Sequence, residues 1–311
     1  MMQPVISVIN FSKSFGKNLA VKNLNLDVEK GELFGLIGPD GAGKTTTIRT
    51  LVTLISPDSG ELSVTGLNVS KNIREIRSIT GYMPQRFSLY PDLSVSQNLN
   101  FFANLFEVPK KEIAERKKRL FKFSNLEPFS ERLAGQLSGG MKQKLALSCT
   151  LIHNPVVLIL DEPTTGVDPV SRSEFWEILQ ELKKEGVTIL VSTPYMDEAL
   201  LCDRIAIMHE GSVLAMGKPE TITGLMHNHI YKITGQDLVL RSNLIAQIPE
   251  IISVQSFGDS LHLTIPPGFS HEDIRLKIYD LLGQQLNIER IAPSLEDVFI
   301  GLIEGEIEHG N

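Results

Sequence analysis

Cysteine is scarce in this chain, with only two copies, Cys149 and Cys202, among 311 residues. The two stand apart in apolar surroundings, so they form neither the paired spacing of a zinc site nor a disulfide framework. We expect both to be buried packing residues of a protein in a reducing compartment.

Long apolar runs are also missing. No stretch approaches the ~18 to 20 residues that a helix needs to span a bilayer. Residues 1–11 lack the basic region followed by an apolar block that marks a signal peptide. The sequence therefore predicts a cytoplasmic protein, in which any role at a membrane comes through a partner.

An excess of positive charge is absent as well. The net charge is −7 and the pI is about 5.6, which argues against a surface built to hold nucleic acid. The basic run at 115–119 is best explained as a solvated helix face. With 42% hydrophobic and 22% charged residues, packed globular cores are expected, and the length corresponds to about two domains.

The chain does contain a glycine-rich turn between an apolar strand at 33–37 and a helix that follows it. The turn matches the G-x-x-x-x-G-K-[ST] pattern of phosphate-binding loops. Its glycines permit backbone conformations that direct successive N–H groups at an anion, while the lysine reaches the β and γ phosphates and the threonine hydroxyl can ligate Mg²⁺. The residues predicted to bind a nucleoside triphosphate here are Gly38, Pro39, Asp40, Gly41, Ala42, Gly43, Lys44, Thr45 and Thr46.

Two adjacent carboxylates end a second apolar strand. Asp161 and Glu162 directly follow the run at 157–160. An aspartate in this place can hold Mg²⁺, usually through water, and the glutamate can polarise the attacking water. Gln85, which follows a short strand at 79–83, supplies a neutral ligand for the metal and the water. These residues predict ATP hydrolysis that depends on Mg²⁺.

The signature Leu-Ser-Gly-Gly at 137–140 offers a second anion-binding nest. Ser138 contributes a hydroxyl, and Gly139 and Gly140 contribute N–H groups, at the start of a helix. Phe15, near the N-terminus, is placed to stack on a base. In this order and spacing, the residues from 5 to about 220 resemble the ATP-binding subunit of ABC transporters.

The resemblance implies a head-to-tail homodimer, in which the signature of one subunit closes over ATP held by Lys44 of the other. It also implies that Asp168 lies at the subunit interface, and that the segment after Gln85 and a helical insertion contact separate integral membrane permease subunits. The protein would then sit peripherally on the cytoplasmic face of the inner or plasma membrane, with no nucleic-acid partner. The tail at 292–299 resembles ATPases of bacterial ABC-2-type exporters, the drug-resistance group among them.

Alternating strands and helices predict an α/β fold with a mostly parallel sheet and some antiparallel strands. An ABC ATPase domain is expected at 1–223, with a helical subdomain at about 86–140. The accessory domain at 224–311 has the βαββαβ, ferredoxin-like order. It could bind a regulatory ligand, brace the dimer or touch the membrane subunits, and bracing is the role we expect. A polar turn is predicted at 11–16 and a helix at 237–247.

One position departs from the family pattern, because Pro194 stands where a histidine normally contacts the γ-phosphate. Proline has neither a side-chain donor nor a backbone N–H, and a lost donor in such a site costs roughly 10²-fold or more in rate. Thr193 and Tyr195 are the candidate substitutes. Asp40 replaces a more usual asparagine, and its carboxylate is expected to point away from phosphate.

Three functions fit the sequence. Because Glu162 is intact, we favour a working but slow ATPase that drives a membrane exporter. The alternative that Pro194 motivates is an ATP-gated binding or regulatory module with little hydrolysis. A soluble ABC protein that acts on nucleic acid ranks last, since the chain has one phosphate loop and an acidic balance.

Overall fold

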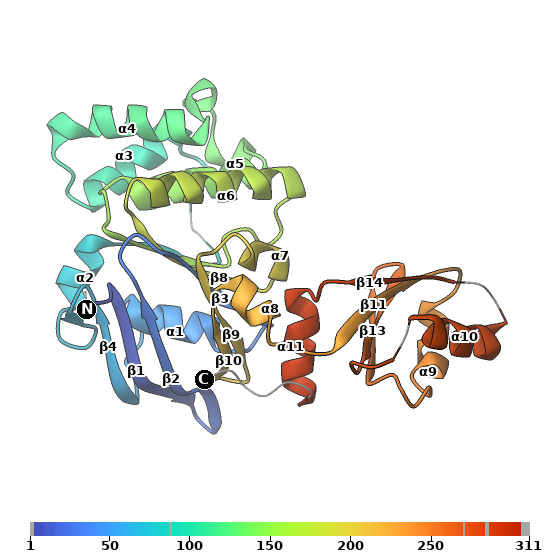
Figure 1. Cartoon of the computed structure of the whole chain (residues 1–311). Coiled ribbons are helices and arrows are strands. Elements are labelled where there is room, and N and C mark those ends of the chain that lie inside the picture. Colours follow the sequence, from blue (N-terminus) through green and yellow to red (C-terminus); the bar gives the residue numbers. More distant parts are fainter. Residues whose placement is uncertain (1–2, 87–88, 270, 284–285, 306–311) are drawn as a thin grey trace. The chain divides into compact units, whose positions relative to one another are not determined.

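The computed structural model describes residues 3–86, 89–269, 271–283 and 286–305 (Figure 1). By its internal contacts the chain divides after Pro219 into two compact units. The domain boundary expected after residue 223 falls at the end of the short helix α8 (Pro219–Thr223) and stays a prediction. Residues 87–88, in the segment after Gln85, lie outside the described residues.

The first unit is built on a six-stranded sheet with the order β10-β9-β3-β8-β7-β6. Neighbours from β9 to β6 run parallel, and only the edge strand β10 is antiparallel. The central strands are continuous apolar runs because both of their faces are covered, which confirms the predicted parallel sheet. The strands are β3 (Leu33–Ile37), β6 (Thr80–Met83), β7 (Val157–Asp161), β8 (Thr188–Thr193), β9 (Arg204–His209) and β10 (Ser212–Gly217).

A second, antiparallel sheet of four strands has the order β2-β1-β4-β5. The polar turn predicted at 11–16 is largely wrong, because β1 continues to Phe15. β1 stays paired with β2 and β4 beyond its apolar stretch, through several irregularities in register. Hydrogen bonds to neighbouring strands cannot be predicted from the local sequence. The strands are β1 (Ile6–Phe15), β2 (Asn18–Val28), β4 (Ser59–Val64) and β5 (Leu67–Asn68).

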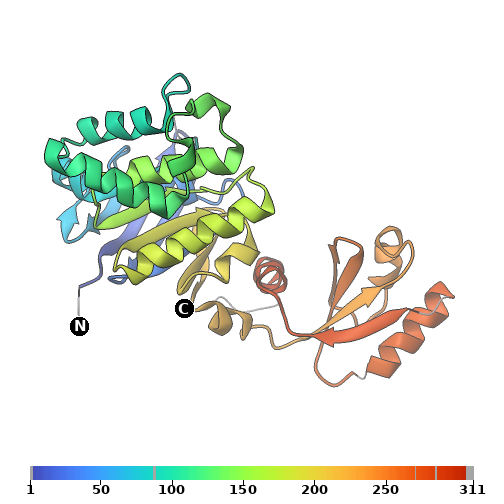
Figure 2. The same cartoon turned by 90° about the horizontal axis from the view of Figure 1, so that it is seen from above.

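Helices cover both faces of the parallel sheet. α1 packs between the two sheets, whereas α5 and α6 cover the opposite face (Figure 1). α3 and α4 contact each other and α5, and Figure 2 shows these helices gathered together. None of the helices described is both long and apolar enough to cross a membrane. The helices are α1 (Lys44–Leu51), α2 (Ile73–Ile79), α3 (Val95–Leu105), α4 (Lys110–Ser124), α5 (Gly139–Leu151), α6 (Pro169–Lys184) and α7 (Met196–Ala199), with 3₁₀ turns at Glu127–Phe129 and Ala134–Gln136.

The second unit has the βαββαβ order predicted for it. Its antiparallel sheet runs β12-β13-β11-β14, and isoleucine and leucine side chains on one face form its core with α9 and α10. The helix predicted at 237–247 is wrong in extent, because a 3₁₀ turn ends at Arg241, whose φ of −106° and ψ of 4° are not helical, and only a single helical turn follows. The elements are β11 (His229–Thr234), η3 (Val239–Arg241), α9 (Ser242–Ile245), β12 (Ser253–Phe257), β13 (Ser260–Ile265), α10 (His271–Leu282), β14 (Asn287–Ile291) and α11 (Leu295–Glu304).

The two cysteines are free thiols, and both are buried as expected. Cys149 lies in α5, and Cys202 follows α7 with its sulfur against Gly35 of β3. Burial raises the pKa of both thiols, so neither has the thiolate character of a reactive cysteine. Their role in this fold is packing.

Candidate functional site

The phosphate loop joins β3 to α1, and its glycines are required by geometry. Gly43 has a φ of +103°, and a Cβ built on it would lie 2.6 Å from the carbonyl oxygen of Ala20. A Cβ on Gly38 would lie 2.2 Å from the carbonyl oxygen of Met208. No side chain fits at either position, so the backbone itself forms the wall. Residues 40–46 line a cavity of about 680 Å³.

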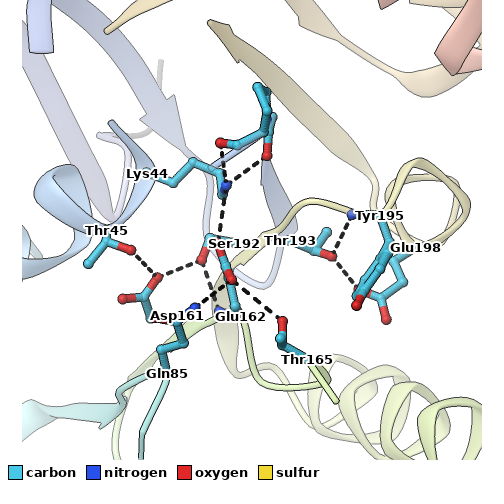
Figure 3. Close-up of polar contacts among 12 residues, drawn as sticks. Lys44, Thr45, Gln85, Asp161, Glu162, Thr165, Ser192, Thr193, Tyr195 and Glu198 are labelled. Carbon is cyan, nitrogen blue, oxygen red and sulfur yellow. Dashed lines mark hydrogen bonds and ion pairs between the residues drawn. The ribbon is translucent and has the colours of Figure 1, made fainter. Parts of the chain in front are cut away.

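Lys44 is buried at the N-terminus of α1, where its charge is fully compensated. Its Nζ donates hydrogen bonds to the carbonyl oxygens of Gly38, at 2.7 Å, and Pro39, at 3.0 Å. The same atom lies 3.2 Å from Oε1 of Glu162, which is also buried (Figure 3). A buried ammonium requires such partners, and here they come from the loop and from the predicted water-activating carboxylate.

Asp161, at the end of β7, has one oxygen bonded and one oxygen free. Its Oδ1 accepts hydrogen bonds from Thr45 Oγ1 at 3.0 Å and from Ser192 Oγ at 2.8 Å. Its Oδ2 is buried and has no hydrogen-bond partner among the described residues. Burial raises the pKa of this carboxyl, and the hydrogen bonds from Ser192 and Thr45 act against that shift. An orphaned carboxylate oxygen is an open position for a cation.

Glu162 is held at both its backbone and its side chain. Its φ is +49°, an uncommon value for a residue with a side chain, and its N–H donates to the backbone oxygen of Ser192 at 3.1 Å and to Ser192 Oγ at 3.0 Å. Gln85, which follows β6, donates from Nε2 to Glu162 Oε2 at 2.8 Å. The structure thus joins Gln85, Glu162 and Lys44 in one chain of contacts (Figure 3).

Other predicted residues form the wall of the loop cavity. Phe15 is 51% exposed and lines the cavity, with the ammonium of Lys13 5.6 Å from its ring centroid. Asp40 is exposed on the same wall, and the direction expected for its carboxylate stays a prediction. Lys22 and Glu210 also line the cavity, although no local motif marks them in the sequence.

The signature residues lie elsewhere on the same chain. Ser138 caps α5, and its hydroxyl accepts a backbone hydrogen bond of 3.3 Å from the first helical turn. Gly139 lines a different cavity, of about 440 Å³, and Gly140 packs so tightly that a Cβ would lie 2.3 Å from Ser171 Oγ. Asp168 caps the adjoining α6, because its Oδ1 accepts a hydrogen bond of 3.0 Å from the backbone N–H of Ser171. This hydrogen bond lowers the pKa of the Asp168 carboxyl.

The residues beside Pro194 are directed away from the phosphate loop. The Thr193 hydroxyl donates to the buried carboxylate of Glu198 (Figure 3). The Tyr195 ring centroid lies 4.3 Å from the guanidinium carbon of Arg172. None of the residues at 193–195 lines the loop cavity. Neither candidate substitute therefore occupies the place of the missing histidine.

Ser192 is a site residue that the sequence analysis did not single out. It pairs with Asp161 across the parallel strands β7 and β8, far from it in sequence. The available signal was a polar residue at the end of a buried apolar strand, where the carboxyl ends of neighbouring strands meet. Its contacts with Asp161 and Glu162 depend on strand order, which local pattern does not encode.

Comparison with known proteins identifies the family. The model of the family described as ABC transporter matches residues 21–165. The probable multidrug ABC transporter ATP-binding protein YbhF of Escherichia coli K12 is 42% identical over 92% of this chain. The chain spans about half of that relative, 49% of its length. The Nod factor export ATP-binding protein I of Rhizobium sp. strain N33 is 38% identical, over 99% of this chain and 100% of its own.

Solved structures agree with the sequence relatives. CbiO1 from Clostridium perfringens, part of the ABC transporter complex cbiONQ, superposes with a TM-score of 0.67 at 28% identity, covering 80% of this chain and 97% of its own. The dimeric ATP-binding cassette MJ0796, in a post-hydrolysis state bound to ADP and Pi, gives 0.62 at 27% identity, covering 68% of this chain and 98% of its own. This chain belongs to the ATP-binding subunits of ABC transporters.

Proposed function

We propose that this chain is the ATP-hydrolysing subunit of an ABC-type exporter, which couples ATP-driven closure of a homodimer to movement of separate membrane subunits. The observation that carries the proposal is the continuous set of contacts from Lys44 through Glu162 to Gln85 at the loop cavity. A phosphate-binding lysine, a water-activating carboxylate and a water-orienting amide are the parts that hydrolysis requires.

The residues beside this chain of contacts fit a magnesium ion. Asp161 Oδ2 is buried without a hydrogen-bond partner in the described part of the chain, and the hydroxyl of Thr45 donates to the other oxygen of the same carboxylate. Together with the amide oxygen of Gln85, they form an all-oxygen donor set of the kind that Mg²⁺ takes. When bound, the ion neutralises charge on the phosphate oxygens.

The protein groups then act in a definite order. Lys44 exchanges the carbonyls of Gly38 and Pro39 for phosphate oxygens, because a charged acceptor is the stronger partner. A phosphate oxygen that also takes the place of Glu162 on Lys44 frees the glutamate, and its carboxylate then accepts a proton from water that Gln85 helps to orient. General-base catalysis of this kind supplies about 10² to 10⁴ in rate.

A second subunit is needed to complete the site. Ser138, Gly139 and Gly140 stand at the start of α5, and Gly139 lines a separate cavity, so we assign the signature to ATP held by the partner subunit. The MJ0796 cassette is dimeric, which supports a dimer here. We assign this dimer a head-to-tail arrangement of two identical chains, with Asp168 at the interface. Phe15 is assigned to the base and residues 38–46 to the phosphates.

The relatives support a role in export. Their names include multidrug transport and Nod factor export, and cbiO1 is part of a complex with other proteins. We assign the segment after Gln85 and the helical subdomain at 86–140 to contacts with integral membrane permease subunits. The protein then lies peripherally at the cytoplasmic face of the membrane, without a nucleic-acid partner.

One observation favours a second function, an ATP-gated module with little hydrolysis. Pro194 brings no donor, Thr193 is bonded to Glu198, and Tyr195 lies against Arg172. A site that lacks this donor in both subunits retains ATP binding while losing transition-state stabilisation.

Steady-state phosphate release separates the two functions. Purified protein is assayed with Mg-ATP beside Glu162→Gln, which keeps the shape of the side chain and removes the base. Release by the natural chain at least about 10²-fold above the variant supports the exporter ATPase. Equal, near-zero release, with ATP still driving dimerisation, favours the gated module.

A further inference from the structure

Ser192 contacts both adjacent acidic residues of the phosphate site, Asp161 through its carboxylate and Glu162 through its backbone N–H. It stands near the carboxyl end of β8, paired with Asp161 of β7, and its relative exposure is 0%. Its hydroxyl donates to Asp161 Oδ1 at 2.8 Å and accepts from the backbone N–H of Glu162 at 3.0 Å. One side chain therefore contacts the predicted metal ligand and the predicted base at once (Figure 3).

The direction of both hydrogen bonds is fixed by chemistry. A hydroxyl has one proton, which is given to Asp161, because an ionised carboxylate only accepts. The oxygen of Ser192 can then only accept from the N–H of Glu162. The same N–H also reaches the backbone oxygen of Ser192, so two acceptors from one residue hold Glu162 at its positive φ of 49°.

We propose that Ser192 is a positioning residue that sets the Asp161 carboxylate for Mg²⁺ and, through the same hydroxyl, fixes the backbone from which Glu162 projects. Two hydroxyls, from Ser192 and Thr45, donate to Oδ1 of Asp161, and the buried Oδ2 has no hydrogen-bond partner among the residues that the structure describes. Donors that saturate one oxygen in this way orient a ligand and tune its affinity for the metal. The proposal deepens the proposed function and rests on its assignment of Asp161 to the metal.

The test is a titration of Mg²⁺ into the full-length chain with a fluorescent, non-hydrolysable ATP analogue. Ser192→Ala removes only the hydroxyl, and Ser192→Thr returns one. The matched control is Thr188→Val, which removes a buried hydroxyl at the other end of the same strand, bonded to the N–H of Gly31 at 3.0 Å. The melting temperature of each variant reports its folding.

The expected result is a 10- to 100-fold rise in half-saturating Mg²⁺ for Ser192→Ala, with binding of the analogue in EDTA unchanged. Thr188→Val keeps the Mg²⁺ dependence of the natural chain, and Ser192→Thr recovers most of the loss. The conservative variant separates positioning from packing, since its extra methyl group alters packing while its hydroxyl remains.

Equal Mg²⁺ dependence in Ser192→Ala and Thr188→Val would overturn the inference, as would a natural chain whose analogue binding ignores Mg²⁺. Phosphate release is measured in parallel. A chain that needs Ser192 for Mg²⁺ yet releases no phosphate refutes the ATPase and keeps the positioning role. If the natural chain hydrolyses ATP and Ser192→Ala changes neither assay, the positioning role is refuted and the ATPase is kept.

Discussion

Restoring a donor at Pro194 tests how far the missing histidine limits hydrolysis. Pro194 follows directly on β8, one residue beyond the hydroxyl of Thr193. Pro194→His adds an imidazole and a backbone N–H where the natural residue has neither. Residue 194 takes no part in the contact of Thr193 with Glu198 or in that of Tyr195 with Arg172, so the substitution leaves both contacts in place.

The size of the effect follows from what one donor is worth. Removing a single preorganised donor from a comparable site costs about 10² to 10³ in kcat, or about 2.7 to 4 kcal/mol. The cavity already supplies Lys44, Glu162 and Gln85, and an imidazole that extends from position 194, at the end of β8, has to reach the phosphate from outside its present lining. We expect Pro194→His to raise kcat by about 10²-fold, the lower end of that range, because its ring is not held by evolved contacts.

Steady-state phosphate release is compared for the natural chain, Pro194→His and Pro194→Ala. The alanine variant frees the backbone and adds an N–H without adding a ring, so it isolates the contribution of the imidazole. Equal kcat for the histidine and alanine variants would refute the reasoning. It would show that the strand end is remodelled and that hydrolysis does not depend on a donor there.

Two further predictions concern stability. Gly140→Ala places a Cβ 2.4 Å from the Cβ of Ser171, and we expect it to lower the free energy of unfolding in urea by about 1 to 3 kcal/mol. The control is Gly139→Ala, which has open space around it and is expected to be neutral. Equal effects of the two substitutions would contradict the packing described for Gly140. Although burial alone raises it, hydrogen bonds from His262 and Ser294 bring the pKa of Asp297 below its usual value. Its carboxylate therefore stabilises the fold above the unfolded-state pKa of about 3.9 and loses this effect as the pH falls through the lower native value, so the melting-temperature gap between the natural chain and Asp297→Asn shrinks below about pH 4. A gap that widens in acid would refute this sign.

Much of the ATPase unit could be predicted because its chemistry is local in sequence. The apolar run before Asp161 is a buried strand, and the glycines at 38 and 43 occupy positions that admit no side chain. The predicted order βαββαβ also holds in the second unit, whose strands are short apolar segments separated by turns, although its first helix is only a single turn.

The remaining features depend on contacts between distant segments. Ser192 meets Asp161 only because β8 lies beside β7, and the strand β1 extends through a predicted turn only because two neighbours pair with it. The direction of the Thr193 hydroxyl is set by Glu198, a buried carboxylate that also accepts hydrogen bonds from Thr164 and Arg172. Such partners follow from tertiary arrangement, which no short window contains.

The ion pair between Lys44 and Glu162 has a consequence for the resting protein. While the lysine holds the glutamate at 3.2 Å, the positive charge that would attract phosphate and the negative charge that would deprotonate water cancel each other. A phosphate group that replaces Glu162 on Lys44 would separate the two charges, so nucleotide binding would free the glutamate to act as a base. The ion pair would thus keep Glu162 inactive as a general base until a phosphate group is bound.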